Sequence, residues 1–271
     1  MAFSPRVHVL ILVVGGLVVF ALSVLVRRSF PRLASLDTAP WSSTLAYVAT
    51  SYGVVVGFSI LLLFGEFSDA RQAVGDEATA IGTAFEEARL FPDDAAEVQH
   101  ALICYARALP EFEWPALREG ESAPEVDDAY RGVILALGDV EQPAESTFQP
   151  AAATNMFVQV GNISTARETR VVAAQTHVPP LLWALLIGGG LFVVGLIFVV
   201  TLPARPVAQG VLVGLSAVFT AVMILIVVGL STPFASGTGR VTPKLIEETT
   251  ASMEQEAPDA AAQPCDFEGG G

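Results

Sequence analysis

The most constraining feature of this sequence is a set of four apolar runs of twenty or more residues that contain no Asp, Glu, Lys or Arg. They lie at residues 7–26, 45–64, 181–202 and 207–230. At about 1.5 Å per residue, a helix of this length spans the roughly 30 Å hydrocarbon core of a bilayer. Since 52% of the chain is hydrophobic and only 15% is charged, these runs predict an integral membrane protein with four spanning helices.

The second run passes without a proline into a helix of a different kind. From Glu66 to Phe91, apolar residues recur at helical spacing, which is typical of a helix that buries one face. Pro92 is expected to end this helix, because the residue before a proline is pushed out of the helical backbone conformation. We therefore expect the second span to be continuous with a helix of an aqueous domain.

The rest of the sequence predicts an all-α membrane protein with two transmembrane helical hairpins flanking a helical bundle. Residues 1–64 form the first hairpin, 65–178 the helical domain and 179–230 the second hairpin. Residues 231–271 are predicted to be a mostly disordered tail, because their last part is rich in Ala, Pro, Asp and Gly. A short amphipathic helix is expected within this tail, from Thr242 to Met253.

The helical domain is divided by its prolines and glycines. Helices are expected at residues 95–108, 126–137 and 152–176, and Pro110 is expected to end the first of them. Residues 66–177 hold 20 acidic residues against 7 arginines, most of the net charge of −14 on the chain. Such a surface repels phosphate backbones, so nucleic acid is not an expected partner.

Basic residues suggest an orientation in the membrane. The two short loops between spans hold Arg27, Arg28, Arg32 and Arg205, whereas the basic residues of the other side are spread over longer segments. Positive residues in short loops favour the cytoplasmic side of a membrane. The arginine count therefore places both termini and the acidic domain outside.

Pairs of glycines in the spans are candidates for helix packing. Gly53 and Gly57 stand four residues apart in the second span, as do Gly210 and Gly214 in the fourth, and such pairs let helices approach closely. Packing of the spans within one chain explains these glycines, but so does a subunit contact or a pore wall.

The absence of Asp, Glu, Lys and Arg from the spans argues against an ion-coupled transporter. A passive pore does not need such residues, because an apolar constriction can open and close as water enters and leaves it. Phe58 and Phe64 suit the lining of such a pore, and ordinary packing explains them equally well.

The cysteines and histidines do not indicate catalysis or metal binding. Cys104 and Cys265 stand far apart, which predicts no disulfide framework, and they are expected to be a buried thiol and an incidental tail residue. Glu97, His100 and Cys104 share a helical face, but a metal site needs a fourth ligand, so neither a metal nor a cofactor is expected. Since no histidine meets a nucleophile in a recognisable motif, we expect no enzymatic activity.

One carboxylate falls inside the apolar stripe of the domain helix. Glu77 lies on the same face as Val74 and Ile81. A buried carboxylate requires a cation, which Arg167 or Arg170 of the later helix would supply across an antiparallel bundle. The alternative is that Glu77 lies at the edge of the stripe, in water.

Twelve residues in a fixed order carry a resemblance to a known family. They begin after the second span, continue through the acidic domain and end after the fourth span: Phe67, Ala70, Arg71, Glu77, Tyr105, Glu113, Trp114, Arg167, Arg170, Trp183, Pro233 and Phe234. In this order they resemble the bacterial bestrophin-like family of unknown function, which is named for its likeness to bestrophins.

The resemblance implies an architecture and a function. Bestrophins are pentameric anion channels in which a pore-lining second span continues into cytoplasmic helices. The resemblance therefore implies an oligomer in a bacterial plasma membrane and a cytoplasmic domain, the opposite of what the arginine count favours. One departure concerns Arg71, which is followed by Gln72 and Ala73, whereas bestrophins carry an aromatic pair beside an arginine at this place.

Two functions are compatible with these observations. The first is a passive anion channel, a homo-oligomer in the lipid bilayer with the second span lining the pore and a small anion as its ligand. The second is a non-conducting scaffold or sensor whose helical domain binds a protein partner.

Overall fold

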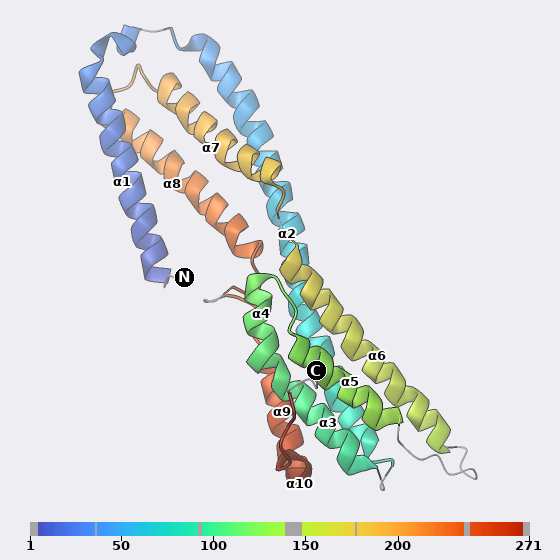
Figure 1. Cartoon of the computed structure of the whole chain (residues 1–271). Helices are drawn as coiled ribbons and strands as arrows, with labels where there is room; N and C mark the ends of the chain where they lie inside the picture. The colour runs from blue at the N-terminus through green and yellow to red at the C-terminus, as the bar shows by residue number, and fades with distance from the viewer. Residues whose placement is uncertain are drawn as a thin grey trace. The chain divides into compact units, whose positions relative to one another are not determined.

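The computed structural model of the chain describes residues 5–35, 37–91, 94–138, 148–176, 178–235 and 239–267. All regular elements in these residues are helices, as Figure 1 shows. The described residues divide into two units, the first made of those within residues 5–65 and 178–232, the second of the remainder. An all-α fold with a span that continues into a domain helix is thereby confirmed.

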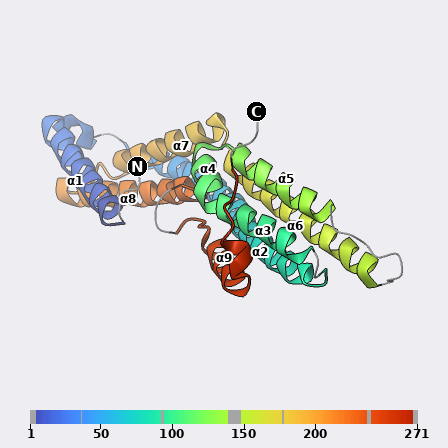
Figure 2. The same ribbon diagram turned by 60° about the horizontal axis from the view of Figure 1, so that its bottom comes forward.

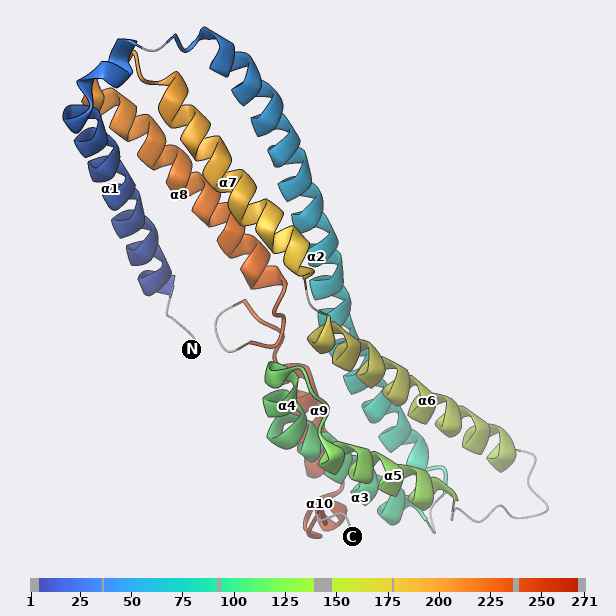
Figure 3. The same ribbon diagram turned by 45° about the horizontal axis from the view of Figure 1, so that its top comes forward.

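The first unit holds the four predicted spans. They lie in helix α1 (Pro5–Ser29), the first half of α2 (Ala39–Ala88), α7 (Pro180–Val200) and α8 (Pro206–Leu230). A short 3₁₀ helix, η1 (Pro31–Ser35), follows α1. All four long helices are long and apolar enough to cross a membrane. Figure 3 shows α7 and α8 running side by side, and a short turn joins them.

Helix α2 is 50 residues long, or about 75 Å at 1.5 Å per residue. A bilayer core of roughly 30 Å accounts for less than half of that length. Its second half, from Glu66, belongs to the second unit. The helix ends at Ala88, a few residues before the predicted end at Phe91.

The two glycine pairs in the spans have different surroundings. A Cβ on Gly210 would lie 2.8 Å from the Phe20 ring of α1, and one on Gly214 would lie 3.2 Å from the Gly16 carbonyl oxygen. This pair packs α8 against α1 within the chain. A Cβ on Gly53 or Gly57, in contrast, would meet no described atom within 4 Å.

The second unit is a helical bundle around the second half of α2. Its other helices are α3 (Ala95–Ala108), α4 (Trp114–Glu119), α5 (Pro124–Gly138), α6 (Phe148–Gln175), α9 (Lys244–Glu256) and α10 (Pro258–Ala261). Figure 2 shows α3 between α5 and α9, with α6 beside α5. The core is built of large buried side chains such as Ile81, Phe85, Leu102, Met156 and Ile163.

The predicted α-helix at residues 95–108 is confirmed, but the chain stays helical beyond it and through Pro110. Helix α3 passes into a π-helical turn, η2 (Leu109–Glu113), and then directly into α4. Pro110 lies in the first positions of this turn, where the wider helical spacing accommodates a residue without an N–H group. The π turn places Glu113 and Trp114 in the bundle interior.

The predicted disordered tail is also corrected. Residues 239–267 belong to the second unit and contain α9, close to the predicted short helix, and α10. Ile246, Met253 and Ala260 are buried in the core, and the Phe267 ring lies 5.3 Å from that of Phe112. Apolar residues placed at helical spacing explain why a segment of disorder-prone composition packs. Residues 236–238 and 268–271 lie outside the described residues.

The contact between α1 and α8 leads to a first prediction. Gly214→Leu should lower the free energy of unfolding by about 1–3 kcal/mol, because the side chain would be forced against Gly16 and Phe20. Thermal unfolding of the detergent-solubilised protein measures this. Gly195→Leu in α7 is the control, since a Cβ there meets nothing within 4 Å. Equal unfolding temperatures for the two variants would contradict the packing.

Candidate functional site

The centre of the second unit is a buried ion pair between α2 and α6. Glu77 and Arg170 are both fully buried, and Arg170 Nη2 lies 3.0 Å from Glu77 Oε2. Tyr105 of α3 donates its hydroxyl hydrogen to Glu77 Oε1 at 2.6 Å. The sequence left open whether Glu77 is buried with a cation or exposed to water. In the structure Glu77 is buried and pairs with Arg170.

The Arg170 guanidinium also lies over an aromatic ring. Its central carbon is 4.7 Å from the centroid of Trp114, a cation–π contact. Trp114 Nε1 donates to the Val241 carbonyl oxygen at 3.4 Å, and the Trp114 ring meets Phe234 edge to face. The Glu77–Arg170 ion pair is thus enclosed by the segments that follow α3 and α8.

A second carboxylate, Glu113, lies beside this pair. Glu113 is fully buried and receives two hydrogen bonds from Arg167, from Nε at 3.0 Å and from Nη2 at 3.1 Å. The Ala123 backbone N–H donates to Glu113 Oε2 at 3.2 Å. Arg167 also binds Asp127 of α5. The bidentate geometry explains the choice of arginine at this position.

The electrostatics of this charge network follow from its burial. Burial raises the pKa of Glu77, and the Arg170 charge and the Tyr105 hydrogen bond oppose that shift. Burial, followed by the Glu77 charge, raises the pKa of Tyr105 well above its usual range, so the phenol stays protonated and donates. For Arg167, burial lowers the pKa, but hydrogen bonds to Glu113 and Asp127 outweigh it and raise the pKa overall.

The charge network holds the helices of the second unit together. It connects α2, α3, α5, α6 and the π turn through ion pairs and hydrogen bonds, although Nε and Nη1 of Arg170 make no hydrogen bond. None of its charged side chains lines either of the two cavities described below. It gathers seven of the twelve positions that carry the family resemblance: Glu77, Tyr105, Glu113, Trp114, Arg167, Arg170 and Phe234. Val241 also takes part, as does Asp127, which no sequence signal singled out.

The other five positions lie elsewhere. Ala70 is buried in the core of the second unit, and Pro233 precedes Phe234 there. Trp183 of α7 packs against the buried apolar cluster of the first unit. Phe67 and Arg71 line a cavity that is described below.

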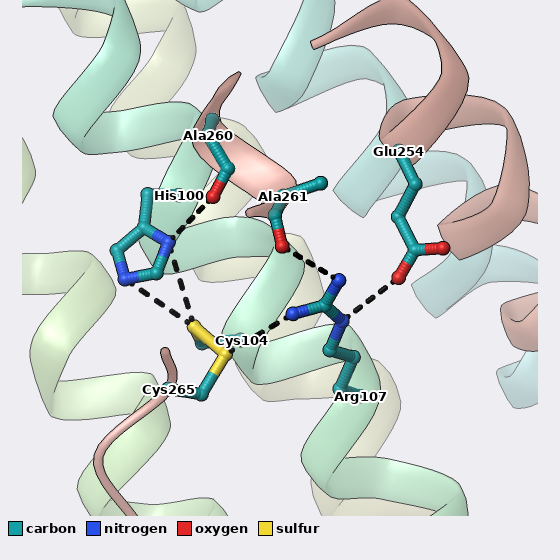
Figure 4. Close-up of a disulfide and its surroundings, with 7 residues drawn as sticks. All are labelled: His100, Cys104, Arg107, Glu254, Ala260, Ala261 and Cys265. Carbon is teal, nitrogen blue, oxygen red and sulfur yellow. Dashed lines mark hydrogen bonds and ion pairs between the residues drawn. A yellow bond between two sulfur atoms is a disulfide. The ribbon is translucent and has the colours of Figure 1, made fainter. Parts of the chain in front are cut away.

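A disulfide joins Cys104 to Cys265, with a sulfur–sulfur distance of 1.98 Å across 161 residues of sequence (Figure 4). The expectation of a buried thiol and an incidental tail residue is therefore wrong. Cys265 lies in the last part of the tail, which the composition predicts to be disordered, so the sequence gives no reason to pair the two cysteines. Because its sulfur is bonded to Cys265, Cys104 cannot serve as a metal ligand together with Glu97 and His100. Among the described residues, no group of three His, Cys, Asp or Glu side chains could hold a metal ion.

Polar contacts surround the disulfide and hold the same C-terminal segment. His100 Nδ1 donates to the Ala260 carbonyl oxygen at 2.9 Å, and Arg107 Nη2 donates to that of Ala261 at 3.0 Å. Arg107 Nε also donates to Glu254 of α9 at 2.8 Å. The C-terminal segment is thus attached to α3 by covalent, polar and apolar contacts.

One face of α2 remains exposed along the helix. In the first unit this face carries the apolar residues Val54, Phe58 and Leu61, and Gly53 and Gly57 lie at its edge. At the continuing spacing of three and four residues, exposed polar residues follow in the second unit: Asp69, Gln72, Asp76 and Thr79.

The polar part of this face borders a groove. The groove has a volume of about 530 Å³ and is completed by Gln159, Asn162, Thr165 and Thr169 of α6. All of these α6 side chains are polar and uncharged, so Asp69 and Asp76 supply the only charges of its lining.

The charge network generates a second prediction. Arg170→Met should lower the free energy of unfolding by about 3–5 kcal/mol, because Glu77 would be left as an unpaired buried charge. The double variant Glu77→Gln/Arg170→Met should recover much of this loss. Denaturant unfolding of the full-length protein in detergent measures both.

The matched control for that experiment is Arg131→Met. Arg131 is largely exposed and pairs with Asp128 on the surface of α5, so its loss should cost only about 0–1 kcal/mol. A double variant that is destabilised by the full sum of its two single changes would contradict the pairing.

Comparison with known proteins places this architecture in a family. A family model for the bestrophin-like domain matches residues 17–245. A solved structure of a bacterial bestrophin homologue from Klebsiella pneumoniae, determined by Zn-SAD phasing, superposes with a TM-score of 0.71 at 14% identity, covering 95% of this chain and 99% of that chain.

A variant of the same homologue gives a TM-score of 0.71 at 12% identity, with 94% of this chain and 100% of that chain covered. At these identities the likeness shows the fold. The search of curated proteins gave no match. The family model, the matching fold and the four apolar helices agree with the resemblance of the sequence: the chain is a membrane protein that belongs to the bestrophin-like family.

Proposed function

We propose that this protein is a homo-oligomeric passive ion channel whose pore is lined by α2. The observation that carries the proposal is the exposed face of α2, which has apolar residues and uncovered glycines in the span and acidic or amide residues beyond it. In a single chain this face has no partner among the described residues. Copies of the chain arranged around a common axis would turn it toward a shared path.

The apolar part of the face suits a passive constriction. Val54, Phe58 and Leu61 would narrow the path without offering a binding group, and such constrictions gate by wetting. The spans contain no Asp or Glu that could relay protons, which favours passive over coupled transport. The proposal assigns no chemical reaction to the protein.

The charges on the face favour cations as the permeant ions. The family resemblance implied anions, but repetition of Asp69 and Asp76 around an axis would produce rings of negative charge, which attract cations. Arg71 could reverse this preference only from the same face, and it lines a different cavity. We therefore propose cation conduction.

We further propose that the second unit lies on the extracytoplasmic side. Disulfides such as Cys104–Cys265 form and persist in oxidising compartments and are rare in the cytosol. The clustering of Arg27, Arg28, Arg32 and Arg205 in the two short loops favours the same orientation. This orientation is opposite to the one that the resemblance to bestrophins implies.

Conduction is tested in planar bilayers that contain the purified full-length protein. We expect currents whose reversal potential in a salt gradient indicates cation selectivity. Asp76→Asn should shift the reversal potential toward zero, the value of a non-selective pore, because it removes one ring of charge. Glu119→Gln, an exposed acidic residue of α4 away from the groove, is the control. Absence of current above protein-free bilayers would favour the scaffold or sensor alternative, and anion selectivity would refute the cation assignment.

Orientation is tested with reporters fused after Gly271. A reporter that is active only in an oxidising compartment, such as alkaline phosphatase, should be active, and a fluorescent protein that matures only in the cytoplasm should be dark. Thiol trapping with an alkylating reagent in intact cells should find Cys104 and Cys265 unreactive until a reductant is added. A fluorescent C-terminal fusion together with free thiols would place the second unit inside.

A further inference from the structure

The second unit contains a basic cavity although the unit as a whole is acidic. The cavity has a volume of about 380 Å³ and lies between α2 and the segment that leads into α9. Its charged lining residues are Arg71, Arg240 and Lys244, and none of its nine lining residues is acidic. Lys244 also pairs with Glu248, which lies outside the lining, at 3.2 Å. An anion bound in the cavity would be attracted by the remaining positive charge of its lining.

Arg71 is the most available of the three cations. It is exposed, and it forms no ion pair with any residue that the structure describes. Its helical neighbours at three and four positions, Phe67, Ser68, Val74 and Gly75, include no carboxylate that could neutralise it. The nearby carboxylates Asp69 and Asp76 line the other groove.

The backbone at the other wall of the cavity adds to the positive potential. Helix α9 begins at Lys244 with thirteen residues, and Pro243 before it provides no side-chain cap for the first N–H groups. The N-terminal end of a helix carries a partial positive charge and unpaired donors. Thr242, Lys244 and Leu245 of this end all line the cavity. Partial burial lowers the pKa of Arg240, which also lines the cavity.

The position of the cavity along the chain points to the membrane surface. Arg71 follows Phe64, the last residue of the uncharged run, by seven residues, or about 10 Å of helix. The polar headgroup layer adds roughly 5–8 Å to each side of the hydrocarbon core. A long arginine side chain at this height reaches that layer. Phe67, Val74 and Leu245 give the cavity an apolar side as well, which suits a ligand with an apolar part.

We propose that this cavity binds the phosphate group of an anionic phospholipid. Arg71 and Lys244 pair with the phosphate, Arg240 adds to the positive potential, and the apolar side contacts the glycerol and the first part of the acyl chains. The site is separate from the proposed pore face of α2, so lipid binding does not depend on whether the protein conducts. The same phosphate chemistry could be supplied by free inorganic phosphate, and the experiment distinguishes the two sources.

Native mass spectrometry and thermal unfolding of the full-length protein in neutral detergent provide the test. The probes are short-chain phosphatidylglycerol, short-chain phosphatidylcholine and inorganic phosphate. Phosphatidylglycerol should bind and raise the unfolding temperature more than phosphatidylcholine. Stabilisation by phosphate that matches phosphatidylglycerol would identify free phosphate as the source, and a much weaker effect would identify the lipid.

Variants locate the binding. Arg71→Gln and Lys244→Gln should each weaken phosphatidylglycerol binding by about tenfold, the loss of one charge-assisted contact, while Arg71→Lys should retain part of it. Arg131→Gln removes an exposed arginine of α5 outside the cavity and is the control. Equal binding of the two lipids, or phosphatidylglycerol binding that Arg71→Gln and Lys244→Gln leave unchanged, would overturn the proposal.

Discussion

Helix α2 must be stable both in lipid and in water, and the rest of the structure depends on that requirement. In the hydrocarbon core every backbone N–H and C=O group must be paired within the helix, because lipid offers no partner. Beyond the core the same helix must bury an apolar face and expose a polar one to water. Because all 50 residues stay helical, one continuous element provides both an apolar surface in the span and the central support of an acidic bundle.

The buried Glu77–Arg170 pair shows the cost of building an aqueous bundle around such a helix. Burying two charges removes their hydration, and only good geometry and further hydrogen bonds offset that cost. Tyr105, Trp114 and the neighbouring Glu113–Arg167 pair provide these contacts. Because each charge would be destabilising without its partner, the network favours one arrangement of the helices over shifted ones. The π turn belongs to the same arrangement, since it brings Glu113 and Trp114 into the bundle.

The second unit combines an uneven distribution of charge with a disulfide. The acidic unit carries a cavity with three cations, and a disulfide attaches the C-terminal segment to α3. Both features involve residues after α8, a segment whose composition suggested disorder. Residues 239–267 therefore complete the second unit: Val241 accepts the Trp114 hydrogen bond, Lys244 lines the basic cavity, and Cys265 closes the disulfide.

The sequence by itself determined the membrane class, the four spans and the continuity of the second span with a domain helix, because these follow from hydrophobic length and helical periodicity, which are local properties. It also identified Glu77 as a carboxylate in need of a cation, and the order of twelve residues identified the family. It could not choose between Arg167 and Arg170, pair Cys104 with Cys265, or separate Gly53 and Gly57 from the packed Gly210 and Gly214. Only the tertiary structure decided these points, because each depends on which distant segments meet in space.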